Sequence, residues 1–451
     1  MNASSEFDVL ILGGGINGAG VARDLALRSA RAGAGLRIAL VERDHFASAA
    51  SSKNSHLIHG GLRYLKQLQV GLVREALRER ATLLAIAPHL VRPQPFLMPM
   101  YGRFASLYYG AGLWAYDLLA GSRRIGWHHR LSRAEVRRLE PDLASEGLTS
   151  AAVFFDARVE AARLVLENIF DAARLGAVVR NYTCAESWTR EGSLWRVAAR
   201  DTLTGERFEI RARKLVDATG PWQPGLRRVR GSHLVFPRLT ASGHAIACFE
   251  ESGRIVFVIP FGENHSLVGT TDCDHEGGPG EVRITAGEVE YLMRQVKRLF
   301  QSRNARPVSA FSALRPLAAP ASGPAAAATR EHRIWNDSQG VLHIAGGKFT
   351  TYRRMSEEAA DLVAAGIAPP LRGLHLTATT PIPEAPRESY ARFERRLTDF
   401  LFISSRIGYE RRWTRDALLP YADEMGARLG WNAETRQREI ERALAFAALP
   451  E

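Results

Sequence analysis

The pattern of apolar and polar positions at the start of the chain predicts a strand, a helix and a second strand. Residues 7–12 form a short apolar run typical of a buried strand, and residues 17–32 have the apolar spacing of a helix. A second apolar run covers residues 36–41 and ends at Glu42. This order predicts one right-handed βαβ unit.

Further strand-like runs lie far from this unit in the sequence. Residues 151–155 and 214–217 are expected to complete the same sheet. Residues 341–345 predict a last strand that precedes a helix over residues 351–365. The fold class is therefore α/β, with a discontinuous Rossmann-like domain built from residues 1–80, 145–225 and 310–370.

The middle and end of the chain have different patterns. Short β-rich runs at 232–237, 244–249, 254–261 and 266–272 have hairpin spacing, so we expect an antiparallel β-sheet in a second domain of residues 81–144 and 226–309. Residues 316–328 predict a surface loop, and residues 380–386 predict a proline-rich linker. Helical spacing over residues 390–449 predicts a small α-helical C-terminal domain, residues 385–451.

Composition narrows the class of protein. With 451 residues, 46% hydrophobic and 24% charged, the chain is long enough for two or three folded domains. The net charge of +12 suits nucleic acid, anionic lipid or an anionic substrate, or reflects a general arginine-rich composition. No nucleic-acid motif is present, so we expect no nucleic-acid partner. Three cysteines without zinc-like spacing predict a reducing compartment and no metal site.

The chain begins without a basic region and apolar run, so we expect no signal peptide and a cytoplasmic location.

One segment has the composition of a membrane-surface anchor. The apolar run at 104–116 is shorter than the ~20 residues that cross a bilayer. Residues 107–119 are apolar and aromatic, and an arginine- and histidine-rich stretch follows at 123–138. A buried helix with a solvated basic end is the alternative interpretation.

The glycines after the first strand predict a dinucleotide site. Gly13, Gly15 and Gly18 allow a tight turn that brings backbone amides and a helix N-terminus close to a pyrophosphate. Glu42 follows at the spacing of a ribose-binding carboxylate.

The segments that follow favour FAD over NAD. A stretch rich in hydrogen-bond donors covers residues 51–55, and Gly60 and Gly61 permit close backbone approach to a flat ring. Two later strand ends also carry glycines, at 218–220 and 346–348. The predicted cofactor-binding residues are Gly13, Gly15, Ile16, Asn17, Gly18, Glu42, Arg43, Ser51, Ser52, Ser55, His59, Gly60, Gly61, Ala218, Thr219, Gly220, Gly346, Gly347, Lys348, Phe349 and Thr350.

These motifs together resemble the FAD-dependent, respiratory glycerol-3-phosphate dehydrogenase family. The matching strings include Gly-Gly-Gly-Ile-Asn-Gly-Ala-Gly (13–20), His-Leu-Ile-His-Gly-Gly-Leu-Arg-Tyr-Leu (56–65), Asp-Ala-Thr-Gly-Pro-Trp (217–222), Gly-Ser-His (231–233), Gly-Thr-Thr-Asp (269–272), Leu-Arg-Pro-Leu (314–317) and Gly-Gly-Lys-Phe-Thr-Thr-Tyr-Arg (346–353). They occur in the family's order over residues 7–365. The chain departs from the family at residues 313–314 and in a shorter C-terminal domain.

The resemblance implies oxidation of sn-glycerol 3-phosphate to dihydroxyacetone phosphate, with electrons passing through FAD to ubiquinone. It also implies a peripheral location on the cytoplasmic face of the inner membrane and a possible homodimer. The implied substrate-binding residues are Arg63, Tyr64, Thr270, Arg315, Arg330 and Lys348, since a phosphate dianion needs cationic donors. The implied catalytic residues are His59, His233 and Arg315.

The reaction needs a base for the proton of the C2 hydroxyl, and an imidazole suits that role near neutral pH. We favour His59 over His233, because Gly60, Gly61 and Arg63 adjoin it. Three other functions stay open: an oxidase that returns electrons to dioxygen, an amine or amino-acid oxidase of the same architecture, and a cofactor-binding regulatory protein without turnover.

Overall fold

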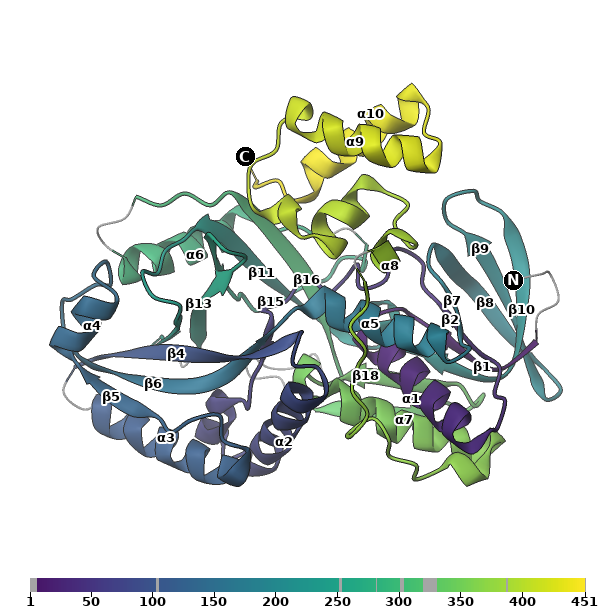
Figure 1. Ribbon diagram of the computed structural model, residues 1–451, viewed down its shortest axis with the longest axis horizontal. Coiled ribbons are helices and arrows are strands. Elements are labelled where there is room, and N and C mark those ends of the chain that lie inside the picture. Colours follow the sequence, from purple (N-terminus) through teal and green to yellow (C-terminus); the bar gives the residue numbers. More distant parts are fainter. Residues whose placement is uncertain are drawn as a thin grey trace.

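Two bodies containing β-sheets lie side by side, and a group of helices at the C-terminal end of the chain packs above them (Figure 1). The structure, a computed structural model, describes residues 6–102, 105–250, 254–280, 282–300, 304–318, 331–386 and 388–450. Arg330 and most of the predicted loop 316–328 lie outside the described residues, and the first two residues of that loop, Pro316 and Leu317, end a strand.

The first sheet contains the βαβ unit that the N-terminal pattern predicts. Its strands, in spatial order, are β17 (His332–Asn336), β18 (Leu342–Gly346), β10 (Arg207–Asp217), β1 (Glu6–Leu12), β2 (Ile38–Val41) and β7 (Val178–Arg180). β1 pairs in parallel with β10 and β2, and β18 pairs in parallel with β10. The hairpin β8 (Thr183–Glu191) and β9 (Leu194–Asp201) extends the sheet from β10.

Alternate residues of β1 build two different cores. Val9 and Ile11 pack on the side of α1 (Ile16–Ala32), α5 (Ala161–Arg174) and α7 (Tyr352–Ile367). Leu10 and Leu12 point to the other face, where they pack with the buried Trp195. Both faces of a parallel sheet are covered in this way, as the apolar run over β1 requires. The predicted Rossmann-like domain is confirmed.

The second sheet is the predicted antiparallel sheet, with one exception. Its strands, in spatial order, are β15 (Cys273–Asp274), β11 (Arg227–Pro237), β14 (His265–Gly269), β13 (Ile255–Phe261), β12 (Ala245–Phe249), β4 (Val91–Tyr101), β6 (Leu148–Val159) and β3 (Leu57–Ile58), with β16 (Ser309–Leu317) on β11 and β5 (His129–Ser132) on β6. β12 and β4 pair in parallel. α2 (Val70–Ile86), α3 (Ala105–Ala120), α4 (Arg133–Leu139) and α6 (Ala286–Leu299) pack around this sheet.

One strand prediction was wrong in its placement. Residues 151–155 belong to β6, which pairs with β3, β4 and β5 in the second sheet and not with the first sheet. The side chains of β6 are buried on both faces, so its apolar run does not reveal which sheet it joins. β16 also lies in the second sheet, although residues 310–370 were assigned to the first domain. The residue boundaries of the three domains stay a prediction.

A strap, the linker of residues 380–386, joins the helices of the first sheet to the C-terminal region, which is helical as predicted. Its helices are α8 (Glu388–Ala391), the π-helical segment Asp399–Ser404, α9 (Arg415–Leu429) and α10 (Ala433–Phe446). The preceding linker is anchored by the buried Arg23 of α1, which donates to the carbonyls of Thr380 and Pro381. The same guanidinium pairs with Asp171 of α5 at 2.8 Å.

Candidate active site

A cavity of about 540 Å³ is lined by segments of both sheets. Most of the predicted site residues line it together: Gly13, Gly15, Ile16, Asn17, Glu42, Arg43, Ser51, Ser55, His59, Gly61, Tyr64, Ala218, Thr219, Gly220, His233, Thr270, Arg315, Gly346, Gly347, Lys348, Phe349 and Thr350. Segments more than 300 residues apart therefore converge on one pocket. This volume is in the range of small-molecule and cofactor sites.

The glycine turn after β1 packs too tightly for side chains. A Cβ atom on Gly13, whose φ is +104°, would lie 2.6 Å from the carbonyl oxygen of Ala218. A Cβ atom on Gly18 would lie 1.9 Å from the carbonyl oxygen of Gly13. Gly18 does not line the cavity, and its contribution is to let α1 begin against the turn. The N-terminus of α1 thus borders the cavity, as a pyrophosphate site requires.

Glu42 at the end of β2 organises the neighbouring backbone. Its carboxylate accepts the amide of Gly14 at 2.7 Å and that of Asp44 at 2.9 Å. Burial raises the pKa of Glu42 to about 7, although both backbone hydrogen bonds oppose the rise. Next to it, the Arg43 guanidinium lies 5.2 Å from the ring centre of Trp222, and both residues line this part of the cavity. The carboxylate lies where a ribose could donate to it.

The serines of the donor-rich stretch at residues 51–55 make different contacts. Ser51 Oγ accepts the amide of Ile16 at 3.0 Å and supports the start of α1. Ser55 Oγ is joined to His233 Nε2 by a hydrogen bond of 2.9 Å. Ser52 is buried, bonds to the carbonyl of Ala49 and does not line the cavity.

His59 and Gly60 face different directions. The half-buried His59 lines the cavity, and its amide donates to Thr350 Oγ1 at 3.2 Å. Gly60 does not line the cavity, because a Cβ there would lie 2.2 Å from Tyr116 Oη and 2.5 Å from Leu77 Cδ2. We expected Gly60 to admit a flat ring, and the structure instead fills the space beside it with these two side chains.

His233 is buried, in contrast to His59. Burial, the positive charge of Arg315 and the neighbouring His56 together lower the pKa of His233 well below its usual value. Its ring stacks on Phe311, with ring centres 5.0 Å apart. A neutral imidazole with a strongly lowered pKa is a weak proton acceptor.

Arg315 of β16 belongs to a charged group at one wall of the cavity. Its guanidinium donates to Asp272 Oδ1 and Thr270 Oγ1, each at 2.7 Å. Arg254 reaches the same place and donates to the carbonyl of Thr270 at 3.2 Å. The guanidinium of Arg315 passes directly over Gly231, the first residue of the Gly-Ser-His motif. This wall, which we call the cation wall, therefore contains two arginines, Arg315 in β16 and Arg254 directly before β13, although β11 and β14 lie between these two strands.

Lys348 and Tyr64 supply another wall of the cavity. The Lys348 ammonium lies 3.9 Å from the ring centre of Tyr64. The ammonium would lie 3.7 Å from a Cβ on Gly61, so Lys348 lies beside residues 59–61, which we call the His59 loop. Arg63 is in the short 3₁₀ helix Leu62–Gln67, and its side chain is outside the described part of the structure, as is all of Arg330.

Three residues at the site were missed from the sequence. Arg254 and Asp272 line the cation wall, and Asp156 lines the cavity beneath the His59 loop. Arg254 directly precedes β13, and Asp272 lies between β14 and β15, so charged residues at the ends of apolar runs were the available signal. Asp156 lies inside a buried strand, and its partners come from distant segments.

The fold and cavity define a class of protein. Residues 8–362 match the family model of FAD dependent oxidoreductases, and the chain belongs to this family. FAD is its cofactor, as predicted, and the glycine turn, Glu42 and the long cavity fit that molecule.

The relatives that are similar in sequence carry more specific names than the family model does. Glycerol-3-phosphate dehydrogenase of Mycobacterium leprae is 38% identical over 379 residues, which are 80% of this chain and 64% of that protein. The protein of the same name from Pseudomonas tolaasii is 37% identical over 378 residues, 79% of this chain and 71% of that protein. The chain thus spans about two thirds of the length of these relatives.

Solved structures share the fold. Glycerol-3-phosphate dehydrogenase from Bacillus halodurans complexed with FAD superposes with a TM-score of 0.74 at 23% identity, covering 98% of this chain and 95% of that one. L-alpha-glycerophosphate oxidase from Mycoplasma pneumoniae, with FAD bound, gives a TM-score of 0.61 at 18% identity, covering 80% and 95%. At these identities the likeness concerns the fold alone.

Proposed function

We propose that the protein oxidises sn-glycerol 3-phosphate to dihydroxyacetone phosphate, with bound FAD as the group that would accept the hydride from C2 and ubiquinone as the final electron acceptor. The observation that carries this proposal is that Lys348, Arg315 and Arg254 line the same cavity as the dinucleotide turn. A phosphate dianion needs several cations, and two planar guanidinium groups suit its oxygens. The names of the relatives in sequence support the same substrate.

In this proposal the cations hold the phosphate while His59 removes the proton of the C2 hydroxyl. His59 suits that role because it borders the cavity and is half-buried. His233 suits it less, because its pKa is lowered well below the usual value by burial and by Arg315. We propose that His233 instead orients Ser55 and packs the wall behind the substrate.

Anaerobic reduction of the flavin tests the activity. sn-Glycerol 3-phosphate should bleach the yellow holoenzyme, while glycerol and glycine should not, because neither carries a phosphate. Bleaching by glycine in place of the phosphate ester would support an amine oxidase and contradict the proposal. The absence of bleaching by all three would be the result expected of a binding protein without turnover.

The electron acceptor needs a separate measurement. With saturating substrate, reduction of a soluble ubiquinone analogue should exceed production of hydrogen peroxide in air. The opposite ratio would indicate an oxidase, an activity that the Mycoplasma pneumoniae protein carries in its name. Light scattering of the purified protein tests the predicted homodimer.

We further propose that helix α3 lies on an anionic membrane surface, from which ubiquinone is drawn. One face of α3 is buried through Leu113 and Tyr116, whereas Leu107 is 77% and Leu118 is 67% exposed. Trp114 and Trp127 add an exposed aromatic pair with ring centres 5.6 Å apart. Exposed arginines follow at positions 123, 130, 133, 137 and 138. Apolar side chains beside cations are typical of interfacial helices.

Vesicle sedimentation tests this docking. The protein should sediment with vesicles that contain phosphatidylglycerol at low salt, and much less with neutral vesicles. Replacing Leu107 and Leu118 with serine should abolish the binding without loss of FAD. No helix in the described part of the chain is long and apolar enough to cross a bilayer.

A further inference from the structure

Helix α2 carries two adjacent charged residues, Glu79 and Arg80, that are each only 1% exposed. Successive residues of a helix point about 100° apart, so the two side chains reach different neighbours. Buried charges need partners, because an unpaired charge away from water is strongly destabilising. The partners of this pair connect α2 to two different walls of the cavity.

Arg80 reaches the backbone that follows His59. Its guanidinium donates to Asp156 Oδ1 at 2.6 Å. The same oxygen accepts the amide of Gly60 at 3.0 Å and the hydroxyl of Tyr116 at 2.8 Å. One carboxylate oxygen thus receives donors from α2, α3 and the His59 loop. Gly60 is also packed against Tyr116 without room for a side chain, so the loop has little freedom here.

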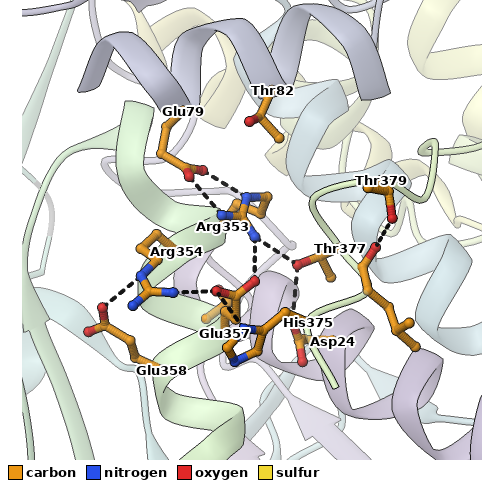
Figure 2. A network of polar contacts seen from close by, with 12 residues as sticks. Asp24, Glu79, Thr82, Arg353, Arg354, Glu357, Glu358, His375, Thr377 and Thr379 are labelled. Atoms are coloured by element: carbon orange, nitrogen blue, oxygen red, sulfur yellow. Dashed lines mark hydrogen bonds and ion pairs between the residues drawn. The ribbon is translucent and has the colours of Figure 1, made fainter. Parts of the chain in front are cut away.

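Glu79 reaches helix α7, which follows the segment that carries Lys348. Its two oxygens accept Nη2 and Nε of Arg353 at 2.7 and 2.8 Å, which is a bidentate ion pair (Figure 2). Arg353 is the second residue of α7 and follows the segment that begins at Lys348. Its remaining nitrogen donates to Glu357 at 2.7 Å. The pair therefore attaches α2 to the element that presents Lys348.

A third contact joins the segment after Lys348 directly to His59, so the contacts form a closed ring, which we call the circuit. Thr350 Oγ1 accepts the amide of His59 at 3.2 Å and reaches the His59 carbonyl at 3.4 Å. Starting from His59, the contacts run through Asp156 to α2, then to α7, and return through Thr350. A closed circuit fixes the relative position of its members more firmly than any one contact does.

We propose that Glu79 and Arg80 are positioning residues that set the His59 loop against the Lys348 segment at the separation that proton removal requires. The proposal rests on the proposed function and goes beyond it, since neither residue lines the cavity. A misplacement of about 1 Å at a reacting group can cost on the order of 100-fold in rate. Opening the circuit at either side should therefore lower the rate of the chemical step while substrate affinity changes little.

The experiment weakens the circuit at Asp156 and at the pair of Glu79 with Arg353, and compares the two effects. Tyr116→Phe removes one donor to Asp156, and Glu79→Gln weakens the pair with Arg353. Each variant should lower the limiting rate of anaerobic flavin reduction by about tenfold or more, and change the dissociation constant of sn-glycerol 3-phosphate less than about threefold. The double variant should be slower than either by less than the product of the two effects, since both act on one geometry.

Tyr101→Phe is the matched control. Tyr101 of β4 also donates a hydroxyl hydrogen bond, at 3.2 Å to the carbonyl of Ala144, but it does not line the cavity. Its limiting rate should stay within about twofold of wild type. If Glu79→Gln does not fold, Arg80→Lys takes its place, because lysine keeps a positive charge beside Asp156 but lacks the guanidinium that joins Asp156 to α2.

The outcomes separate the two proposals. A wild-type flavin that is bleached normally, with Glu79→Gln, or Arg80→Lys in its place, no slower than Tyr101→Phe, would overturn the positioning role and leave the proposed function in place. Equal losses in affinity and rate would indicate a general structural role and also overturn it. A wild-type flavin that sn-glycerol 3-phosphate does not bleach would overturn both.

Discussion

Replacing Gly231 with alanine would displace the guanidinium of Arg315 and so test its role in substrate affinity. A Cβ atom on Gly231 would lie 2.1 Å from Nη2 and 2.4 Å from Cζ of Arg315. Ordinary contact begins at 3.4 Å, so the guanidinium must move by about 1.3 Å. Gly231 lies inside β11 in a backbone conformation open to alanine, so the arginine yields and the strand does not.

The size of the effect follows from the bonds that this displacement disturbs. Arg315 donates to Asp272 Oδ1 and Thr270 Oγ1, each at 2.7 Å, and these bonds aim it into the cavity. A hydrogen bond to a charged group contributes about 1.5–3 kcal/mol, and about 1.4 kcal/mol corresponds to a factor of ten in affinity. We expect the KM for sn-glycerol 3-phosphate to rise about 10- to 100-fold, with a smaller change in kcat.

The assay is steady-state turnover with a ubiquinone analogue, together with the FAD content of the purified variant. Gly287→Ala in α6 is the control, because no atom lies within 4 Å of the added Cβ. Its KM should equal that of the wild type. A KM for Gly231→Ala within about twofold of wild type, at full FAD content, would refute the role given to Arg315.

Three further predictions concern other parts of the molecule. Arg254→Met should raise KM by about tenfold in the same assay, and an unchanged KM would exclude Arg254 from phosphate binding. Burial lowers the pKa of His56 to about 3. Below about pH 6.5 the imidazole is therefore protonated in the unfolded chain but stays neutral in the folded chain, so the free energy of unfolding decreases as the pH falls. Urea denaturation of holo His56→Asn should show a slope smaller by about 1.4 kcal/mol per pH unit between pH 6 and 4, and an equal slope would contradict this. Arg23→Ala should lower the free energy of unfolding by about 3 kcal/mol or more, because Asp171 loses its buried partner and the strap loses its anchor; a loss below about 1 kcal/mol in denaturant titration would contradict the burial argument.

The elements that could be predicted from the sequence are those encoded by neighbouring residues. The βαβ unit and the glycine turn depend on periodicity and spacing within about 40 residues, and both are present as predicted. β6 shows the limit of this reasoning. It is buried on both faces, so nothing in its own residues indicates that it pairs with β4 and not with the first sheet.

The candidate site shows the same division. The short motifs pointed to His59, Arg315 and Lys348, which all line one cavity. They did not point to Arg254, whose position beside Arg315 depends on the pairing of β13, β14, β11 and β16. They also predicted that a flat ring would lie beside Gly60, whereas the side chains that fill this space come from α2 and α3.

The sequence by itself determined the class of cofactor site and most of the residue types that line it, because a turn at a strand end and its helix are local structures. Only the tertiary structure decided which of the two cavity-lining histidines is buried and which is half-buried, and which cations meet at one wall. It also joined Arg80 to the backbone that follows His59, and Glu79 to the helix that follows Lys348. Burial and long-range distance arise when distant segments pack together, and no window of the sequence contains them.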